Sequence, residues 1–153
     1  MLLRNRLLPS AARLVLYLGT CTIALFSFSA CSAGNSARTD DDAVVRVTER
    51  DFRITVSPAR VSAGDVRLVL RNRGPDTHEL LIVRTKGGRL PLRTDALTVD
   101  EEVLDPAMAG VIEGEPSGTV HALRLHLRPG RYELFCNMAG HYLGGMHAEL
   151  VVT

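Results

Sequence analysis

The sequence contains no tryptophan, a single lysine (Lys86) and few aromatic residues, which make up 5% of the chain. Charge of neither sign is in excess, since 18 basic and 17 acidic residues leave a formal net charge of +1. Proteins that bind nucleic acid non-specifically carry a strong positive excess, so this composition argues against a nucleic-acid partner. The 153 residues are enough for one domain with a hydrophobic core.

A hydrophobic run long enough to span a bilayer is also missing. The apolar segment 14–28 is shorter than the roughly 20 residues that a membrane-spanning helix needs. Its length is that of a signal-peptide core. Small residues directly before Cys31 resemble the lipobox of bacterial lipoproteins, in which this cysteine is lipidated and becomes the new N-terminus. The alternatives are an ordinary signal peptide cleaved after Ala30 and an uncleaved membrane anchor.

These features predict three parts of the chain. We expect a lipoprotein-type signal peptide at residues 1–30, the lipidated Cys31 with a flexible tether at residues 31–43, and a folded domain at residues 44–153. The tether is small, polar and acidic in composition, which is typical of a flexible linker. The domain is therefore expected outside the cytoplasm, lipid-anchored to the cell membrane and facing the periplasm or the exterior.

No pair of cysteines is left to form a disulfide in the mature domain. Cys21 lies in the apolar run and Cys31 is the expected lipidation site, so Cys136 remains alone. An unpaired thiol in an oxidising compartment is a liability unless it has a function. The alternative is an inert cysteine buried in the core.

The chain shows no alternation of long helices with strands, which argues against a parallel α/β fold. Short alternating segments bounded by turn residues predict strands instead. In segment 44–56, Phe52, Ile54 and Val56 share one parity after a polar interruption at residues 49–51. The further expected strands are residues 66–70, 77–83, 119–127, 132–136 and 148–152. This arrangement predicts an all-β, Greek-key antiparallel β-sandwich.

Residues 84–118 form a long connection between two of these strands. Thr98 and Glu101 have the spacing of a capping box, which predicts a short helix at residues 99–105. Gly110 and Gly114 indicate a loop after this helix. The sequence leaves open whether the insertion covers one side of the sandwich or shapes a partner surface.

Three residues with soft or imidazole donors follow one another at intervals of five near the C-terminus: Cys136, His141 and Met146. A thiolate, an imidazole and a thioether at close range suit copper. A second imidazole comes from His78 at the start of an upstream strand. Because the ends of neighbouring strands meet at one pole of a sandwich, we expect His78 to lie beside the C-terminal loop.

The C-terminal pattern, Gly130-x-Tyr132-x3-Cys136-x4-His141-x4-Met146, resembles that of the cupredoxins, the blue-copper proteins that include plastocyanin, azurin, auracyanin and sulfocyanin. The segment from residue 52 to His78 is similar to the first half of the same domain. Together the resemblance covers about residues 44–153. This chain has Ala139-Gly140 near the loop histidine, where many members have a proline, and Glu79 after the first histidine, where many have an asparagine.

The resemblance implies a cupredoxin-like fold that holds one copper ion, cycling between Cu(I) and Cu(II). His78, Cys136 and His141 would be the strong ligands and Met146 the axial ligand. His141 would be the exposed ligand and the electron exit. The implied function is a membrane-tethered one-electron carrier, expected to be monomeric, with transient redox-protein partners.

Two other functions deserve comparison. A copper carrier or scavenger would deliver copper to another extracytoplasmic protein, but a cysteine between two histidines weighs against it. A copper enzyme would need a second centre with several more histidines, and the remaining His121, His126 and His147 are poorly placed. His121 and His126 are five apart on an expected strand and hence on opposite faces. We therefore expect no enzymatic activity.

Overall fold

A computed structural model describes residues 42–153 of the chain. The predicted signal peptide, the lipidation site Cys31 and the tether up to residue 41 lie outside the described residues. Within residues 42–153, no helix has the length and apolar character required to cross a membrane.

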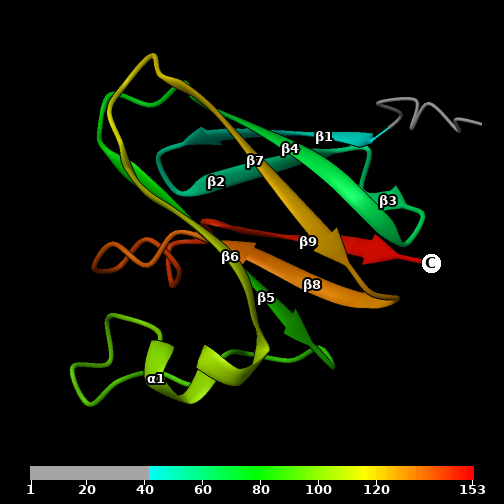
Figure 1. Ribbon diagram of the computed structural model, residues 1–153. Helices are drawn as coiled ribbons and strands as arrows, with labels where there is room; N and C mark the ends of the chain where they lie inside the picture. Colours follow the sequence, from blue (N-terminus) through cyan, green and yellow to red (C-terminus); the bar gives the residue numbers. More distant parts are fainter. Residues whose placement is uncertain (1–41) are drawn as a thin grey trace, which may run out of the picture. The chain divides into compact units, whose positions relative to one another are not determined.

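The described residues form two β-sheets and one short helical segment (Figure 1). The four-stranded sheet has the order β2-β1-β4-β7, which are Arg53–Ser57, Ala43–Arg50, Gly64–Asn72 and Val120–Leu127. The five-stranded sheet has the order β3-β9-β8-β5-β6, which are Arg60–Val61, His147–Val152, Gly130–Phe135, His78–Thr85 and Met108–Glu115. The helical segment consists of α1 (Glu101–Leu104) and the 3-10 turn η1 (Asp105–Ala107). The predicted all-β sandwich with one short helix is confirmed.

Two strand pairs depart from the purely antiparallel arrangement that we expected. Strand β1 runs parallel to β4, with Val45 opposite Leu68, and the short β3 runs parallel to β9. All other pairs are antiparallel. Alternation of apolar and polar residues reports only which face a side chain occupies, so it cannot distinguish the two pairings.

The main core lies between the sheets and follows from this alternation. Val45 and Val47 on β1, Leu80 and Ile82 on β5, and Leu134 on β8 are at most 1% exposed and belong to one apolar cluster. Burial of each such side chain contributes roughly 1.5–3 kcal/mol to folding. The core therefore fixes the relative position of the strands that carry His78 and Cys136.

A second apolar cluster lies on the outer face of the five-stranded sheet. Leu81 and Val83 of β5 and Phe135 of β8 pack there against Leu90 and Leu104 of the insertion. Strand β5 is therefore buried on both faces, in agreement with its nearly continuous apolar sequence. The insertion thus covers this side of the sheet, which answers the question that the sequence left open.

The expectation of a loop after the helix was wrong, because residues 108–115 form the edge strand β6. Gly110 does not break the strand but allows a close approach between the sheets. A Cβ at this position would lie 2.7 Å from Leu125 Cδ2 on β7. Glycine in a strand often marks such a close packing site.

The predicted helix exists, but its N-cap lies two residues later than expected. Asp100, rather than Thr98, is the N-cap, and its side chain accepts a hydrogen bond from the Val103 amide. The Thr98 hydroxyl instead donates to Asp95 at 2.6 Å in the preceding turn. Both residues are good caps, so composition alone did not decide between them.

The sandwich has two ends with different chemistry. Strand β5 begins at His78, and its antiparallel partner β8 ends immediately before Cys136, so both residues lie at the same end, here called the Cys136 pole. Thr85 at the end of β5 and Gly130 at the start of β8 lie at the opposite end, here called the Gly130 pole. In Figure 1 the loop between β8 and β9, in orange, marks the Cys136 pole.

Candidate metal centre

His78 is presented by a tight turn that Asn72 holds together. The Asn72 side-chain amide donates to the carbonyls of Asp76 at 2.7 Å and Glu115 at 2.8 Å, and its oxygen accepts from the Gly74 amide at 2.8 Å. A Cβ on Gly74 would lie 2.8 Å from His78 Nε2. The turn therefore needs glycine at this position to bring the backbone against the imidazole.

The His78 ring is fully buried and has one polar atom without a partner. Nε2 lies 3.0 Å from Asp51 Oδ1. Because a carboxylate only accepts, Nε2 carries the proton and Nδ1 keeps its lone pair. Nδ1 is buried and makes no hydrogen bond with any described residue. Burial lowers the pKa of His78, and the hydrogen bond to Asp51 opposes this shift.

Cys136 follows the last residue of β8 and is also fully buried. The backbone amides of Glu79 and Met138 donate hydrogen bonds to its sulfur. Burial nevertheless raises the pKa of the Cys136 thiol from 9.0 to about 11, so the metal-free protein holds it protonated at neutral pH. The two amides would stabilise a thiolate once a cation replaces the proton.

The loop that follows carries His141 and Met146 and is closed by its own backbone. The His141 amide donates to the Met138 carbonyl at 2.9 Å, and the Met146 amide donates to the His141 carbonyl at 3.0 Å. Gly140 and Gly145 have φ angles of +81° and +102°, which favour glycine. These turns give the loop a defined path without the proline that many cupredoxins have here.

Three of the four predicted ligands meet at this pole. The potential donor atoms of His78, Cys136 and His141 lie within 4.8 Å of one another. Cys136 Sγ is 3.5 Å from His141 Nδ1, and the two imidazole rings have centroids 5.2 Å apart. Such a set of one sulfur and two nitrogens could hold a metal ion, and the unpartnered His78 Nδ1 is the atom that a cation would satisfy.

Met146, the fourth predicted ligand, is fully buried in the same apolar cluster as Cys136. Its carbonyl accepts a hydrogen bond from the Cys136 amide at 3.1 Å. These contacts place the residue beside Cys136. The axial role of its sulfur remains a prediction.

Two residues of the site were missed from the sequence. Asp51, assigned to a polar interruption, is the partner of His78. Phe52 was wrongly placed on the buried face of a strand: it has φ of +59°, is 53% exposed, and meets the His141 ring edge-on at 5.2 Å. The only signal was the cluster of polar residues inside an otherwise regular strand, which indicates a turn.

The other described histidines lie apart from the site. His147 is exposed, with Nδ1 3.3 Å from Glu133 Oε1. His121 lies 2.9 Å from Glu115, and His126 lies 2.7 Å from Asp65. Each is thus next to a carboxylate, and none joins a second group of metal-ligating side chains in residues 42–153.

Several solved structures have a fold similar to that of this domain. Auracyanin from the photosynthetic bacterium Roseiflexus castenholzii is 18% identical, with a TM-score of 0.54 over 73% of this chain and 98% of that chain. Auracyanin A from Chloroflexus aurantiacus, described as a "blue" copper protein, is 16% identical, with a TM-score of 0.54 over 73% and 99%. Rusticyanin is 18% identical, with a TM-score of 0.55 over 73% and 81%.

Neither a protein-family model nor a curated protein matches the chain in sequence. At these identities, structural likeness is evidence of the fold. The described domain therefore has the cupredoxin-like β-sandwich fold, with a His-Cys-His cluster at one pole.

Proposed function

We propose that the domain binds one copper ion through His78, Cys136 and His141, with Met146 as the axial ligand, and acts as a one-electron carrier. The observation that carries this proposal is the buried His78 Nδ1, which has no hydrogen-bond partner among residues 42–153 and belongs to a cluster with one thiol and one further imidazole. The solved structures that share the fold of this domain include one described as a "blue" copper protein. This set of donors suits copper better than other common metals.

The protein contributes a rigid frame and a prepared set of donors. When bound, copper would supply a one-electron couple between Cu(II) and Cu(I). The ligands sit at the start of β5, directly after the end of β8 and on a loop closed by its own hydrogen bonds, so we expect the frame to change little between the two charge states. The amides of Glu79 and Met138 stabilise the Cys136 thiolate.

Electrons would leave through His141. Its side chain is partly exposed, whereas those of His78 and Cys136 are buried. Phe52, which is 53% exposed, meets the His141 ring edge-on at 5.2 Å and gives it an apolar neighbour at the surface. Such a surface suits brief docking of redox-protein partners.

We further propose that the protein is anchored outside the cytoplasm by a lipid on Cys31, with the residues between Cys31 and the start of β1 at Ala43 as the tether. The support is the sequence of residues 1–31, with its apolar run and lipobox-like end. Mass spectrometry of the membrane fraction would detect a diacylglycerol-modified Cys31 peptide. An unmodified peptide that begins at Cys31 would show plain secretion instead.

The absorption and EPR spectra of the copper-loaded protein test the metal site. We expect an intense visible band from sulfur-to-copper charge transfer, which Cys136→Ser abolishes while the fold is retained. A serine variant that keeps the band would exclude the proposed site. Repeated oxidation and reduction without loss of metal supports an electron carrier, whereas release of copper on reduction would favour a copper carrier or scavenger.

A further inference from the structure

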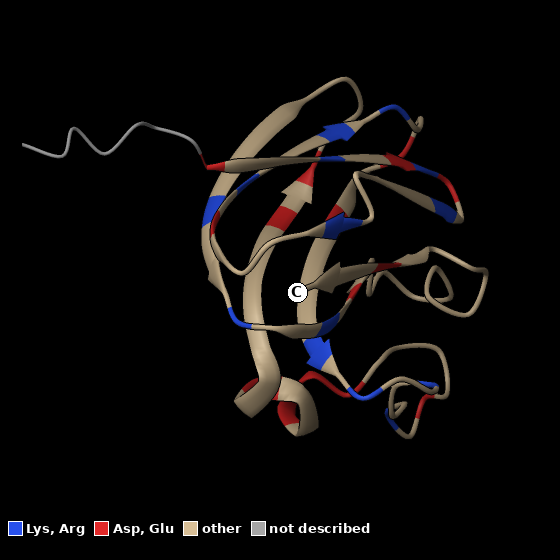
Figure 2. Ribbon diagram, turned by 90° about the vertical axis from the view of Figure 1, so that its right-hand side faces the viewer, with Lys and Arg blue, Asp and Glu red and all other residues tan. Residues whose placement is uncertain are grey.

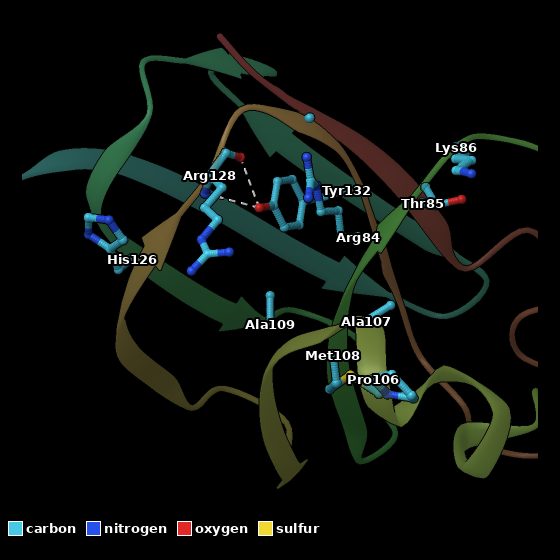
Figure 3. A pocket seen from close by; sticks show the side chains of 11 residues that line it. Arg84, Thr85, Lys86, Pro106, Ala107, Met108, Ala109, His126, Arg128 and Tyr132 are labelled. Atoms are coloured by element: carbon cyan, nitrogen blue, oxygen red, sulfur yellow. Dashed lines mark hydrogen bonds between the residues drawn. The ribbon is translucent and has the colours of Figure 1, made fainter.

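A cavity of about 560 Å³ opens at the Gly130 pole, on the side of the sandwich where the edge strands β6 and β7 face each other (Figure 3). It is distant from the ligand cluster, because the seven-residue step from His78 to Thr85 along β5 spans about 23 Å. The proposed electron-transfer site makes no use of it.

The walls of this cavity differ in character. One wall is apolar and comes from η1 and the start of β6, with Pro106, Ala107 and Met108. The facing wall carries the cationic side chains of Arg84, Lys86 and Arg128, and none of the described residues that line the cavity is acidic. An amphiphilic anion, with an oxyanion group on an apolar body, complements both walls.

The basic wall is held in place by specific contacts. Arg84 Nη2 donates to the Pro129 carbonyl at 2.6 Å, and a Cβ on Gly130 would lie 2.7 Å from Arg84 Nε. A side chain at position 130 would therefore collide with the Arg84 guanidinium, and glycine avoids this collision. The Tyr132 hydroxyl donates to the Arg128 carbonyl at 2.9 Å and accepts from the Arg128 amide at 3.1 Å, which fixes the backbone that carries this arginine (Figure 3).

The positive charge of this wall is not neutralised within the domain. Neither Lys86 nor Arg128 forms an ion pair with another residue of the described chain, in contrast to Arg131, which pairs with Glu149. His126, which lines the cavity, has Nδ1 2.7 Å from Oδ1 of Asp65, and both Asp65 and Asp42 line the adjoining cavity. Lys86 and Arg128 thus remain available to an external anion, and Arg84 adds a third positive charge, with its Nη2 donating to the Pro129 carbonyl.

The described chain also begins at this pole. Asp42 Oδ2 lies 3.4 Å from Arg124 Nε. Asp42 also lines a second, smaller cavity, and His126 lines both this cavity and the basic one. Any tether that precedes Asp42 therefore joins the domain beside the basic wall. Figure 2 looks onto the side of the domain where the C-terminus lies and shows Lys and Arg segments, in blue, together with Asp and Glu segments, in red, around it.

We propose that this cavity binds the phosphate headgroup of an anionic phospholipid when the tether holds the domain at the membrane. Guanidinium groups match phosphate oxygens with paired hydrogen bonds, and the apolar wall receives the glycerol ester portion of the lipid. The Gly130 pole would then face the membrane and His141 would point toward partner proteins. This inference rests on the membrane attachment proposed above and is independent of the metal.

Lys86 is the only lysine of the chain, so its acylation by an amine reagent, read by peptide mass spectrometry, reports on the cavity. The experiment uses the full chain in nanodiscs of phosphatidylcholine, with or without phosphatidylglycerol. We expect phosphatidylglycerol to slow acylation of Lys86 by about fivefold or more, the effect of roughly one cation–lipid contact. Arg128→Gln should remove most of this protection.

Arg53→Gln is the matched control, because it removes the same charge from an exposed site at the Cys136 pole. Equal loss of protection in both variants would show diffuse attraction and overturn the proposal. Protection by soluble glycerol phosphate in phosphatidylcholine discs, without an effect of phosphatidylglycerol, would also overturn it in favour of a free phosphate ester. Flotation of the discs and the visible copper band, recorded on the same samples, report separately on attachment and on the metal.

Discussion

At the scale of single residues, Asp51 decides how His78 is presented. Its carboxylate lies 3.0 Å from Nε2 and so fixes the tautomer that leaves Nδ1 free. A negative charge on the outer side of a metal-bound imidazole also makes the ring a stronger donor. Asp51 is therefore expected to favour Cu(II), the state with the higher charge.

Asp51→Asn keeps an oxygen that can accept from Nε2 but removes the charge. We expect Cu(II) affinity to fall by about tenfold to 100-fold, the usual effect of changing a partner of a ligand. If Cu(I) affinity is unchanged, each tenfold loss raises the reduction potential by about 59 mV. Metal titration and cyclic voltammetry measure the two quantities.

Asp76→Asn is the control for this prediction. Asp76 lies in the turn that precedes His78, and its charge acts on the His78 ring without a side-chain hydrogen bond. Its effect on the potential should be clearly smaller. Equal shifts in the two variants would mean that Asp51 acts only as a nearby charge, and a lower potential in Asp51→Asn would contradict the argument.

Met146 offers a second residue-scale test. Met146→Leu keeps an apolar side chain of similar volume in the core but removes the sulfur. If the thioether is an axial ligand that stabilises Cu(II), the variant should still bind copper and show a higher reduction potential. A lower potential measured by voltammetry would exclude the axial role.

At the scale of elements, the loop between β8 and β9 depends on the insertion. The Asn137 side chain accepts from the Val99 amide at 2.6 Å and donates to the Val99 carbonyl at 3.0 Å and to Glu101 at 2.6 Å. Asn137 directly follows Cys136 and is 7% exposed. The insertion thus holds the start of the ligand loop.

Asn137→Ala should therefore destabilise the protein. It leaves the buried amide and carbonyl of Val99 without partners, which costs about 1–3 kcal/mol of unfolding free energy. Chemical denaturation of the metal-free protein measures this change. Met138→Ala, a change in the exposed neighbour, should stay within about 0.5 kcal/mol, and a similar loss in both variants would argue against the role of Asn137.

The elements also show what the sequence could predict. Alternation along β1, β4 and β7 located their strands, and the spacing of Cys136, His141 and Met146 located the loop, because both depend on local periodicity. Strand β6 was missed because Gly110 was read as a loop residue, whereas it lies in a strand and allows close packing between the two sheets. Phe52 was misplaced because its positive φ turns the chain out of the strand. Such features depend on residues that are distant in sequence.

At the scale of the whole molecule, the sandwich buries a carboxyl group that has no hydrogen-bond partner in the described part of the chain. Glu49 at the end of β1 is fully buried, and both of its oxygens lack a hydrogen-bond partner among the described residues. Burial raises the pKa of Glu49 from 4.5 to about 8, and the charges of Glu115 and Glu79 add to the shift. The folded protein therefore holds this group neutral at pH 7.

This shift makes the stability of the metal-free protein depend on pH. Below about pH 4.5 Glu49 is protonated in both the folded and the unfolded state, so its ionisation has no effect. Between 4.5 and about 8 only the unfolded state ionises, and the free energy of unfolding falls as pH rises. At 1.36 kcal/mol per pKa unit, the full loss is at most about 5 kcal/mol.

Glu49→Gln removes this ionisation, so the variant should be more stable than the wild type at pH 8 and similar at pH 4. Glu133, whose pKa burial also raises and whose charge does not contribute to the Glu49 shift, acts equally in both proteins and cancels in the difference. Urea denaturation of the metal-free proteins across this range measures the difference in unfolding free energy. A difference that is constant with pH would show that Glu49 is ionised in the folded state, and therefore that an unidentified positive charge or water compensates it within the sandwich.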